Sequence, residues 1–152
     1  MRPFSLLFIL VFFPILGFSQ DHKNIISGNI LGSSSAIGLS YERIVSDNLS
    51  LELGAGIIGL GAGISVYPWK IQTSSLCFYT GLKVSSFVLV DVGGGTVAYV
   101  PFGALFFTPS NWIIGLDVGP ANGKLVSSSF GGATSETTRF YIFGNLKLGF
   151  RF

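Results

Sequence analysis

Charged residues are scarce in this chain of 152 residues: only 11% are Asp, Glu, Lys or Arg, whereas 49% are hydrophobic. An ordinary soluble domain has about 25% charged residues, because its surface must be hydrated. The composition therefore favours a chain whose outer surface meets lipid or partners. After residue 20, no apolar stretch approaches the roughly 20 residues of a membrane-spanning helix. The other structure that crosses a bilayer is a closed β-barrel, in which neighbouring strands satisfy every backbone polar group.

Cysteine and histidine each occur once, which excludes several kinds of chemistry. Cys77 can form no intramolecular disulfide and offers no cysteine pair to a metal. His22 precedes the first expected strand, so it is poorly placed as the general base of a lipid hydrolase or acyltransferase. The triplet 93–95 (GGG) lacks the Lys-Ser/Thr that follows in a phosphate-binding loop. We therefore expect no enzyme activity, no cofactor and no metal site. The formal charge of +2, with scattered basic residues, argues against a nucleic-acid partner.

The first 20 residues have the pattern of a secretory signal peptide. Arg2 supplies a positive charge, residues 4–18 are almost wholly apolar, and residues 17–20 (GFSQ) resemble a cleavage region. We predict a cleaved signal peptide over 1–20 and a single mature domain over 21–152. A retained helical anchor is the alternative.

The mature chain divides into eight segments, each about long enough for a tilted membrane strand of 9–11 residues. They are 24–31, 36–45, 49–57, 60–67, 75–85, 96–107, 112–118 and 139–152. Within them, apolar residues alternate with small or polar ones; Leu49, Leu51 and Leu53, for example, alternate with Ser50 and Glu52. A helical period would scatter such sets around the helix. The fold class we predict is all-β, an antiparallel up-and-down transmembrane β-barrel of eight strands.

The lengths of the connections agree with such a barrel. If both termini face the periplasm, 46–48, 68–74 and 108–111 are periplasmic turns, and the longest connections, 86–95 and 119–138, are outer loops. The Gly/Ser/Thr-rich loop 119–138 is the expected contact segment for an extracellular partner. The apolar stretch 87–92 (FVLVDV) fits a loop poorly. Either it extends the fifth strand above the membrane, or the fifth and sixth strands are placed too low.

The same alternation places six charged residues on the inner face of the barrel. They are Glu42, Glu52, Lys83, Asp117, Lys147 and Arg151. The interior of an eight-stranded barrel is just wide enough for side chains to fill, and an unpaired buried charge is costly. We expect these acids and bases to pair into a plug, with a proton- or ion-conducting path as the alternative. A slip of one residue in register would reverse the orientation.

Alternation is strictest in the last residues, where Leu146, Leu148, Phe150 and Phe152 are separated by polar or small residues. Other short segments are 18–20 (FSQ), 39–43 (LSYER), 48–51 (NLSL), 99–103 (YVPFG), 111–112 (NW) and 117–120 (DVGP). Together these segments resemble small outer-membrane β-barrel proteins of the Bacteroidota, and more broadly the OmpA-barrel and OmpX-like group. The resemblance implies that the four alternating residues are a signal read by the barrel-assembly machinery. It brings no catalytic residues.

We therefore expect a non-enzymatic barrel of the Gram-negative cell envelope, located in the outer membrane after export. Its role would be envelope structure or surface interaction through outer loops, and its partners would include outer-membrane lipids. One alternative is a small channel or transport protein of the outer membrane. Another is a periplasmic barrel that binds a lipophilic ligand, although an eight-stranded interior could not hold all the large apolar residues.

Overall fold

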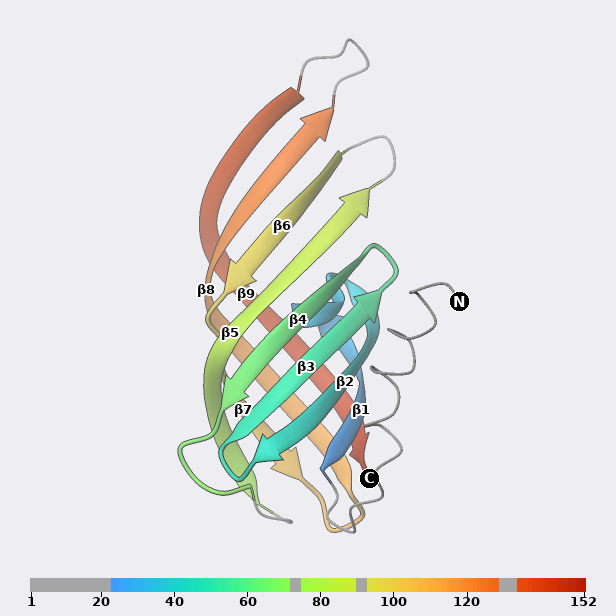
Figure 1. Cartoon of the computed structure of the whole chain (residues 1–152), viewed down its shortest axis with the longest axis vertical. Helices are drawn as coiled ribbons and strands as arrows, with labels where there is room; N and C mark the ends of the chain where they lie inside the picture. The colour runs from blue at the N-terminus through green and yellow to red at the C-terminus, as the bar shows by residue number, and fades with distance from the viewer. Residues whose placement is uncertain (1–22, 72–74, 90–92, 129–133) are drawn as a thin grey trace, which may run out of the picture.

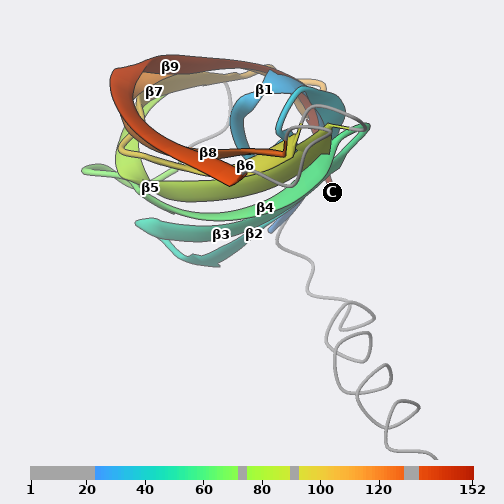
Figure 2. The same cartoon turned by 90° about the horizontal axis from the view of Figure 1, so that it is seen from above.

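The computed structural model of the chain describes residues 23–71, 75–89, 93–128 and 134–152. The predicted signal peptide, 1–20, lies outside these residues. All nine strands within the described ranges belong to one antiparallel sheet that closes on itself (Figures 1 and 2). They are β1 (Asn24–Leu31), β2 (Ile37–Ser46), β3 (Leu49–Gly56), β4 (Gly59–Val66), β5 (Leu76–Leu89), β6 (Gly93–Tyr99), β7 (Phe102–Phe107), β8 (Trp112–Ser128) and β9 (Thr134–Arg151). Closure is made by β1 and β9, where Ile26 lies opposite Phe150.

Two of these strands are halves of one barrel strand. Both β6 and β7 pair with β5 on one side and with β8 on the other. The interruption falls at Val100-Pro101, where the proline has no backbone N–H to give to a ladder. The barrel therefore has eight antiparallel strands in up-and-down order, as the sequence predicted.

The prediction of a long loop over 119–138 is wrong. β8 continues to Ser128, and β9 begins at Thr134. The two strands pair without interruption from Trp112 opposite Phe150 to Ser128 opposite Thr134. Gly119, Pro120 and the Ser/Thr residues suggested a loop by composition. In the structure their backbone pairs with β9, and this pairing outweighs their loop-like composition.

The loop predicted over 86–95 is also shorter than expected. β5 extends to Leu89 and β6 begins at Gly93, with Phe87 opposite Gly95. For Phe87–Leu89, the structure therefore favours an extended fifth strand, while residues 90–92 lie outside the described ranges.

These long strands make one side of the barrel taller than the other (Figure 1). The pairing of β1 with β9 stops at Leu31 opposite Asn145, and that of β4 with β5 stops at Gly59 opposite Phe87. Beyond these points β5, β6, β8 and β9 continue as an open sheet, the extension sheet (residues 88–89, 93–94, 118–128 and 134–144). Among the described strands, residues 134–144 of β9 pair only with β8, which leaves β9 as a long sheet edge.

The outer wall of the barrel is apolar. In β9 the large outward side chains are Phe140, Ile142, Leu146, Leu148 and Phe150. At the usual strand rise and tilt, this row, which runs from the closed barrel onto the extension sheet, spans about 25 Å along the barrel axis. Within the described ranges, no helix has both the length and the apolar character needed to cross a membrane.

Candidate functional site

Five buried charged side chains form a continuous row of ion pairs inside the barrel. Lys147 Nζ lies 2.8 Å from Glu42 Oε2 and 3.0 Å from Glu52 Oε2. Lys83 Nζ lies 3.2 Å from the same Glu52 oxygen and 3.1 Å from Asp117 Oδ2. Acids and bases therefore alternate in the order Glu42, Lys147, Glu52, Lys83, Asp117. None of the five residues is more than 2% exposed.

The two lysines offset the repulsion between carboxylates on neighbouring strands. Glu42 on β2 and Glu52 on β3 lie directly opposite each other, which is unfavourable for like charges. Lys147 reaches both carboxylates from β9, and Lys83 reaches Glu52 from β5. Lys83 faces Gly63 on β4, and a Cβ there would lie 2.7 Å from Lys83 Cγ. The absence of a side chain at position 63 gives the lysine room to cross the lumen.

Each end of the row is an acid capped by neutral donors. Glu42 Oε1 accepts hydrogen bonds from the hydroxyls of Ser50 (2.5 Å) and Tyr67 (3.0 Å). Asp117 accepts hydrogen bonds from Tyr79 (2.5 Å), Tyr99 (3.2 Å) and Asn145 (3.2 Å). Three carboxylates and two ammonium groups give the row one net negative charge. These donors distribute that charge, and every oxygen of the three acids accepts at least one hydrogen bond.

The sixth predicted lumen residue, Arg151, lies near the end of β9. Its guanidinium carbon is 5.4 Å from the centroid of the Phe107 ring. The structure thus brings five of the predicted charged residues into the row and places the sixth over an aromatic ring. The predicted assembly residues Leu146, Leu148, Phe150 and Phe152 lie on the outer wall, each between 42% and 55% exposed. Their role in assembly stays a prediction.

A short turn that the sequence did not reveal is folded into the barrel beside this row. Gly32–Ser34 forms the 3₁₀ turn η2, in which Ser33 and Ser34 are fully buried. The Ser33 hydroxyl donates a hydrogen bond of 2.6 Å to Glu52 Oε1. To enter the lumen, the backbone adopts positive φ at Leu31 (71°), Gly32 (67°) and Ser35 (67°). Positive φ is uncommon for a non-glycine residue, so Leu31 and Ser35 hold backbone strain that packing must offset.

Glycines on β3 and β4 accommodate η2. A Cβ at Gly56 would overlap the carbonyl oxygen of Ser34, and one at Gly61 would overlap that of Ser33. At Gly54 a Cβ would lie 2.7 Å from the same Ser33 carbonyl. The glycines that alternate with apolar residues in these strands therefore form the wall of a socket.

The described interior also contains buried serines and asparagines, such as Ser27, Asn29 and Ser40, and two clusters of mainly apolar side chains. One cluster near the chain ends contains Ile25, Ile44, Tyr67, Cys77, Tyr79, Leu105, Phe107 and Ile113. A second, toward the extension sheet, contains Val97, Tyr99 and Ala121 with Phe87, Tyr141 and Phe143 packed against them. The rings of Tyr99 and Phe143 meet edge to face with centroids 5.0 Å apart. The charged row, η2 and the two apolar clusters therefore all lie inside the barrel.

Within the described residues, no group of three or more His, Cys, Asp or Glu side chains is placed to hold a metal ion.

The chain matches no family model, no curated protein and no solved structure. The fold and the geometry of its interior are therefore what supports a function.

Proposed function

We propose that this protein is a non-enzymatic, integral β-barrel of the outer membrane, with a plugged lumen and an extension sheet that serves as its surface for interaction outside the cell. Residues 1–20 would direct export and be removed. The resemblance to outer-membrane barrels of the Bacteroidota agrees with this placement.

One observation carries the membrane placement: the barrel wall is apolar outside and charged inside. Leu53, Leu60 and Leu116 are 62%, 67% and 63% exposed, whereas Lys83 and Lys147 are 0% and 2% exposed. A soluble barrel would expose those leucines to water, whereas such a protein normally keeps apolar side chains inside and charged ones outside. In a bilayer, lipid takes the place of water around the wall. The same observation disfavours a periplasmic barrel with an apolar ligand inside.

Aromatic residues support a membrane interface near the end of the barrel where the two chain ends lie. Trp112 and Phe150 stack edge to face on the outer wall, with centroids 5.8 Å apart, close to the end where Asn24 pairs with Phe152. Trp69, in the connection between β4 and β5, is 68% exposed. Aromatic girdles of this kind mark the membrane interfaces of such barrels. Short turns join β2 to β3 and β7 to β8 at this same end, which favours the periplasm for it. The extension sheet then lies toward the extracellular side, and its part beyond Phe140 projects from the apolar band.

The extension sheet replaces the loop 119–138 as the expected contact surface. Its β9 edge, residues 134–144, carries main-chain N–H and C=O groups that no described strand pairs on one side. An unpaired edge of this length is a template for another strand. The plugged lumen, in turn, favours a structural or interaction role over a channel.

The experiment that tests this proposal is expression of the full chain in a diderm host, followed by fractionation and gel electrophoresis with and without heating. We expect recovery with the outer membrane, a faster-migrating unheated band, and no open-channel steps in planar bilayers. Recovery as a soluble periplasmic monomer would overturn the membrane placement. Steady conductance would favour the channel alternative.

Replacing Phe152 with serine is expected to slow insertion in cells while leaving the stability of a folded barrel nearly unchanged. The reason is that Phe152 lies on the outer wall, 46% exposed, where its ring is available for recognition but adds little packing. A pulse-chase measurement of heat-modifiable protein gives the insertion rate, and urea titration of refolded protein gives the stability. Equal insertion rates for the two chains would contradict the assembly role.

A further inference from the structure

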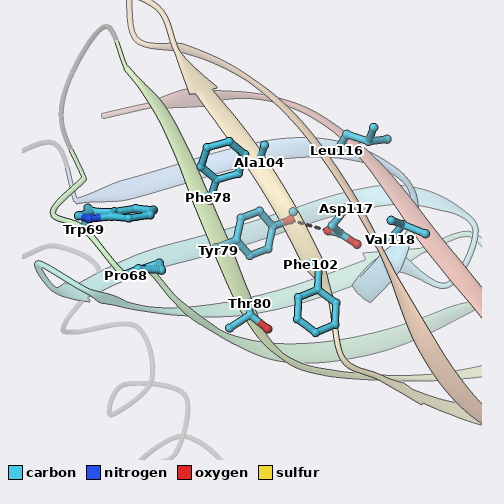
Figure 3. A pocket seen from close by; sticks show the side chains of 11 residues that line it. Pro68, Trp69, Phe78, Tyr79, Thr80, Phe102, Ala104, Leu116, Asp117 and Val118 are labelled. Atoms are coloured by element: carbon cyan, nitrogen blue, oxygen red, sulfur yellow. Dashed lines mark hydrogen bonds between the residues drawn. The ribbon is translucent and has the colours of Figure 1, made fainter.

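An apolar groove lies on the outer wall where the β4–β5 connection passes β5 (Figure 3). Its volume is about 590 Å³, within the range of about 300–1,000 Å³ that is usual for small-molecule sites. The depression arises at Ala104 on β7, which lies in register between Phe78 on β5 and Leu116 on β8. A methyl group between two large side chains leaves a slot along the wall. Trp69, from the connection, forms the far side of the groove.

The end of the groove nearest the chain ends is polar and basic. A second pocket of about 180 Å³ shares Trp69 and Phe78 with the groove and adds Lys70 and Ser75 to its lining. Two other grooves on the outer wall, of about 510 and 690 Å³, are lined by uncharged residues. The groove at Trp69 thus combines an apolar slot with an adjoining cation.

The cation at this end remains charged. Lys70 Nζ lies 2.7 Å from Asp47 Oδ2, and both side chains are largely exposed. The hydrogen bond and the charge of Asp47 raise the pKa of Lys70 above its ordinary value. An exposed pair of this kind is weak, because water and salt screen it. The ammonium group can therefore contact a second anion at little cost in free energy.

We propose that this groove binds one phospholipid of the periplasmic leaflet, with an acyl chain over Ala104 and the phosphate at Lys70. The inference rests on the proposed membrane placement. Trp69 and Lys70 lie in a connection at the end of the barrel assigned to the periplasm, where headgroups of that leaflet meet aromatic and basic anchors. A diacyl phosphate matches both parts of the site, since its chains need apolar surface and its headgroup needs a cation.

Native mass spectrometry of the full-length protein tests this proposal. The folded barrel is reconstituted in vesicles of phosphatidylethanolamine and phosphatidylglycerol, then released in mild detergent, and retained lipid is counted. Ala104→Leu fills the slot, whereas Ala62→Leu adds the same side chain to the outer wall of β4, between Leu53 and Val84. Wild type and Ala62→Leu are expected to retain one phospholipid, and Ala104→Leu to retain about tenfold less. Equal retention by all three, or a dimer in place of the lipid-bound monomer, would overturn the proposal.

A second variant tests the headgroup contact. In vesicles that contain equal amounts of phosphatidylglycerol and an uncharged galactosyl diacylglycerol, wild type is expected to retain the phosphate lipid preferentially. Lys70→Gln should abolish that preference; an unchanged preference would overturn the role of Lys70. Heat-modifiable migration is measured on every sample. A folded barrel without retained lipid contradicts only this inference, whereas failure to enter the membrane contradicts the proposed function.

Discussion

Replacing Lys147 with methionine is expected to destabilise the folded barrel by about 3–5 kcal/mol, the usual cost of removing one partner from a buried ion pair. Lys147 is the only side chain described as bridging Glu42 and Glu52, at 2.8 and 3.0 Å, and these two carboxylates lie opposite each other. Methionine keeps the length and apolar stem of lysine but leaves the carboxylates facing one another. Urea titration of the folded protein in detergent micelles, followed by heat-modifiable migration, measures the loss.

Two controls show whether charge is the cause. Lys124→Met changes an exposed lysine on β8 of the extension sheet and should cost little. Adding Glu42→Gln and Glu52→Gln to Lys147→Met should recover much of the stability, because the opposed charges are then gone. A loss in Lys147→Met no larger than that in Lys124→Met would show that the row contributes nothing to stability.

Substituting valine for Gly56 is expected to expel η2 from the lumen. A Cβ at this position overlaps the carbonyl oxygen of Ser34, and it also lies 3.0 Å from the carbonyl oxygen of Ile37. Both obstacles are backbone, so no rotamer change can relieve them. Because Leu31 and Ser35 already have positive φ, the turn can relax by leaving the socket.

Thiol labelling detects this movement. Ser33→Cys is introduced in a Cys77→Ser background, and the folded barrel is treated with a polar, membrane-impermeant maleimide. Because Ser33 is fully buried, labelling should be slow with Gly56 present and about tenfold faster with valine in its place. Gly28→Val is the matched control, since a Cβ there faces the outer wall and lies 3.8 Å from the nearest atom, Leu148 O. Equal labelling in the two variants would contradict a socket at Gly56.

The eight strands and the faces of their charged residues were predictable because successive side chains of a strand point to opposite faces. Glu42, Glu52 and Lys83 each follow an outward apolar residue, so counting by two places them inside without knowledge of their partners. This alternation does not tell where a strand ends. Between Gly119 and Ser128 the alternation fades, and only pairing with β9 shows that the ladder extends.

Two features of the interior depend on more than one strand, and the sequence therefore did not reveal them. The segment 32–35 (GSSS) has the composition of any outer loop, and its place in the lumen follows from glycines on β3 and β4 that face it. The apolar layer at Leu105 and Phe107 was hidden because residues 104–107 (ALFF) are apolar on both faces. Alternation carries no signal where both faces have the same character.

The order of strands along the chain gives the charged row a further consequence, for the way the barrel closes. Lys147 belongs to the last strand, 105 residues after Glu42 and 95 after Glu52. Until β9 docks, β2 and β3 hold two opposed carboxylates with Lys83 as the only ammonium group of the row to balance them. An incomplete sheet is thus penalised electrostatically at its centre, and arrival of β9 removes the penalty and closes the ring in one step. The row is electrostatically balanced only in the complete barrel. It therefore makes barrel formation cooperative and destabilises partly closed states.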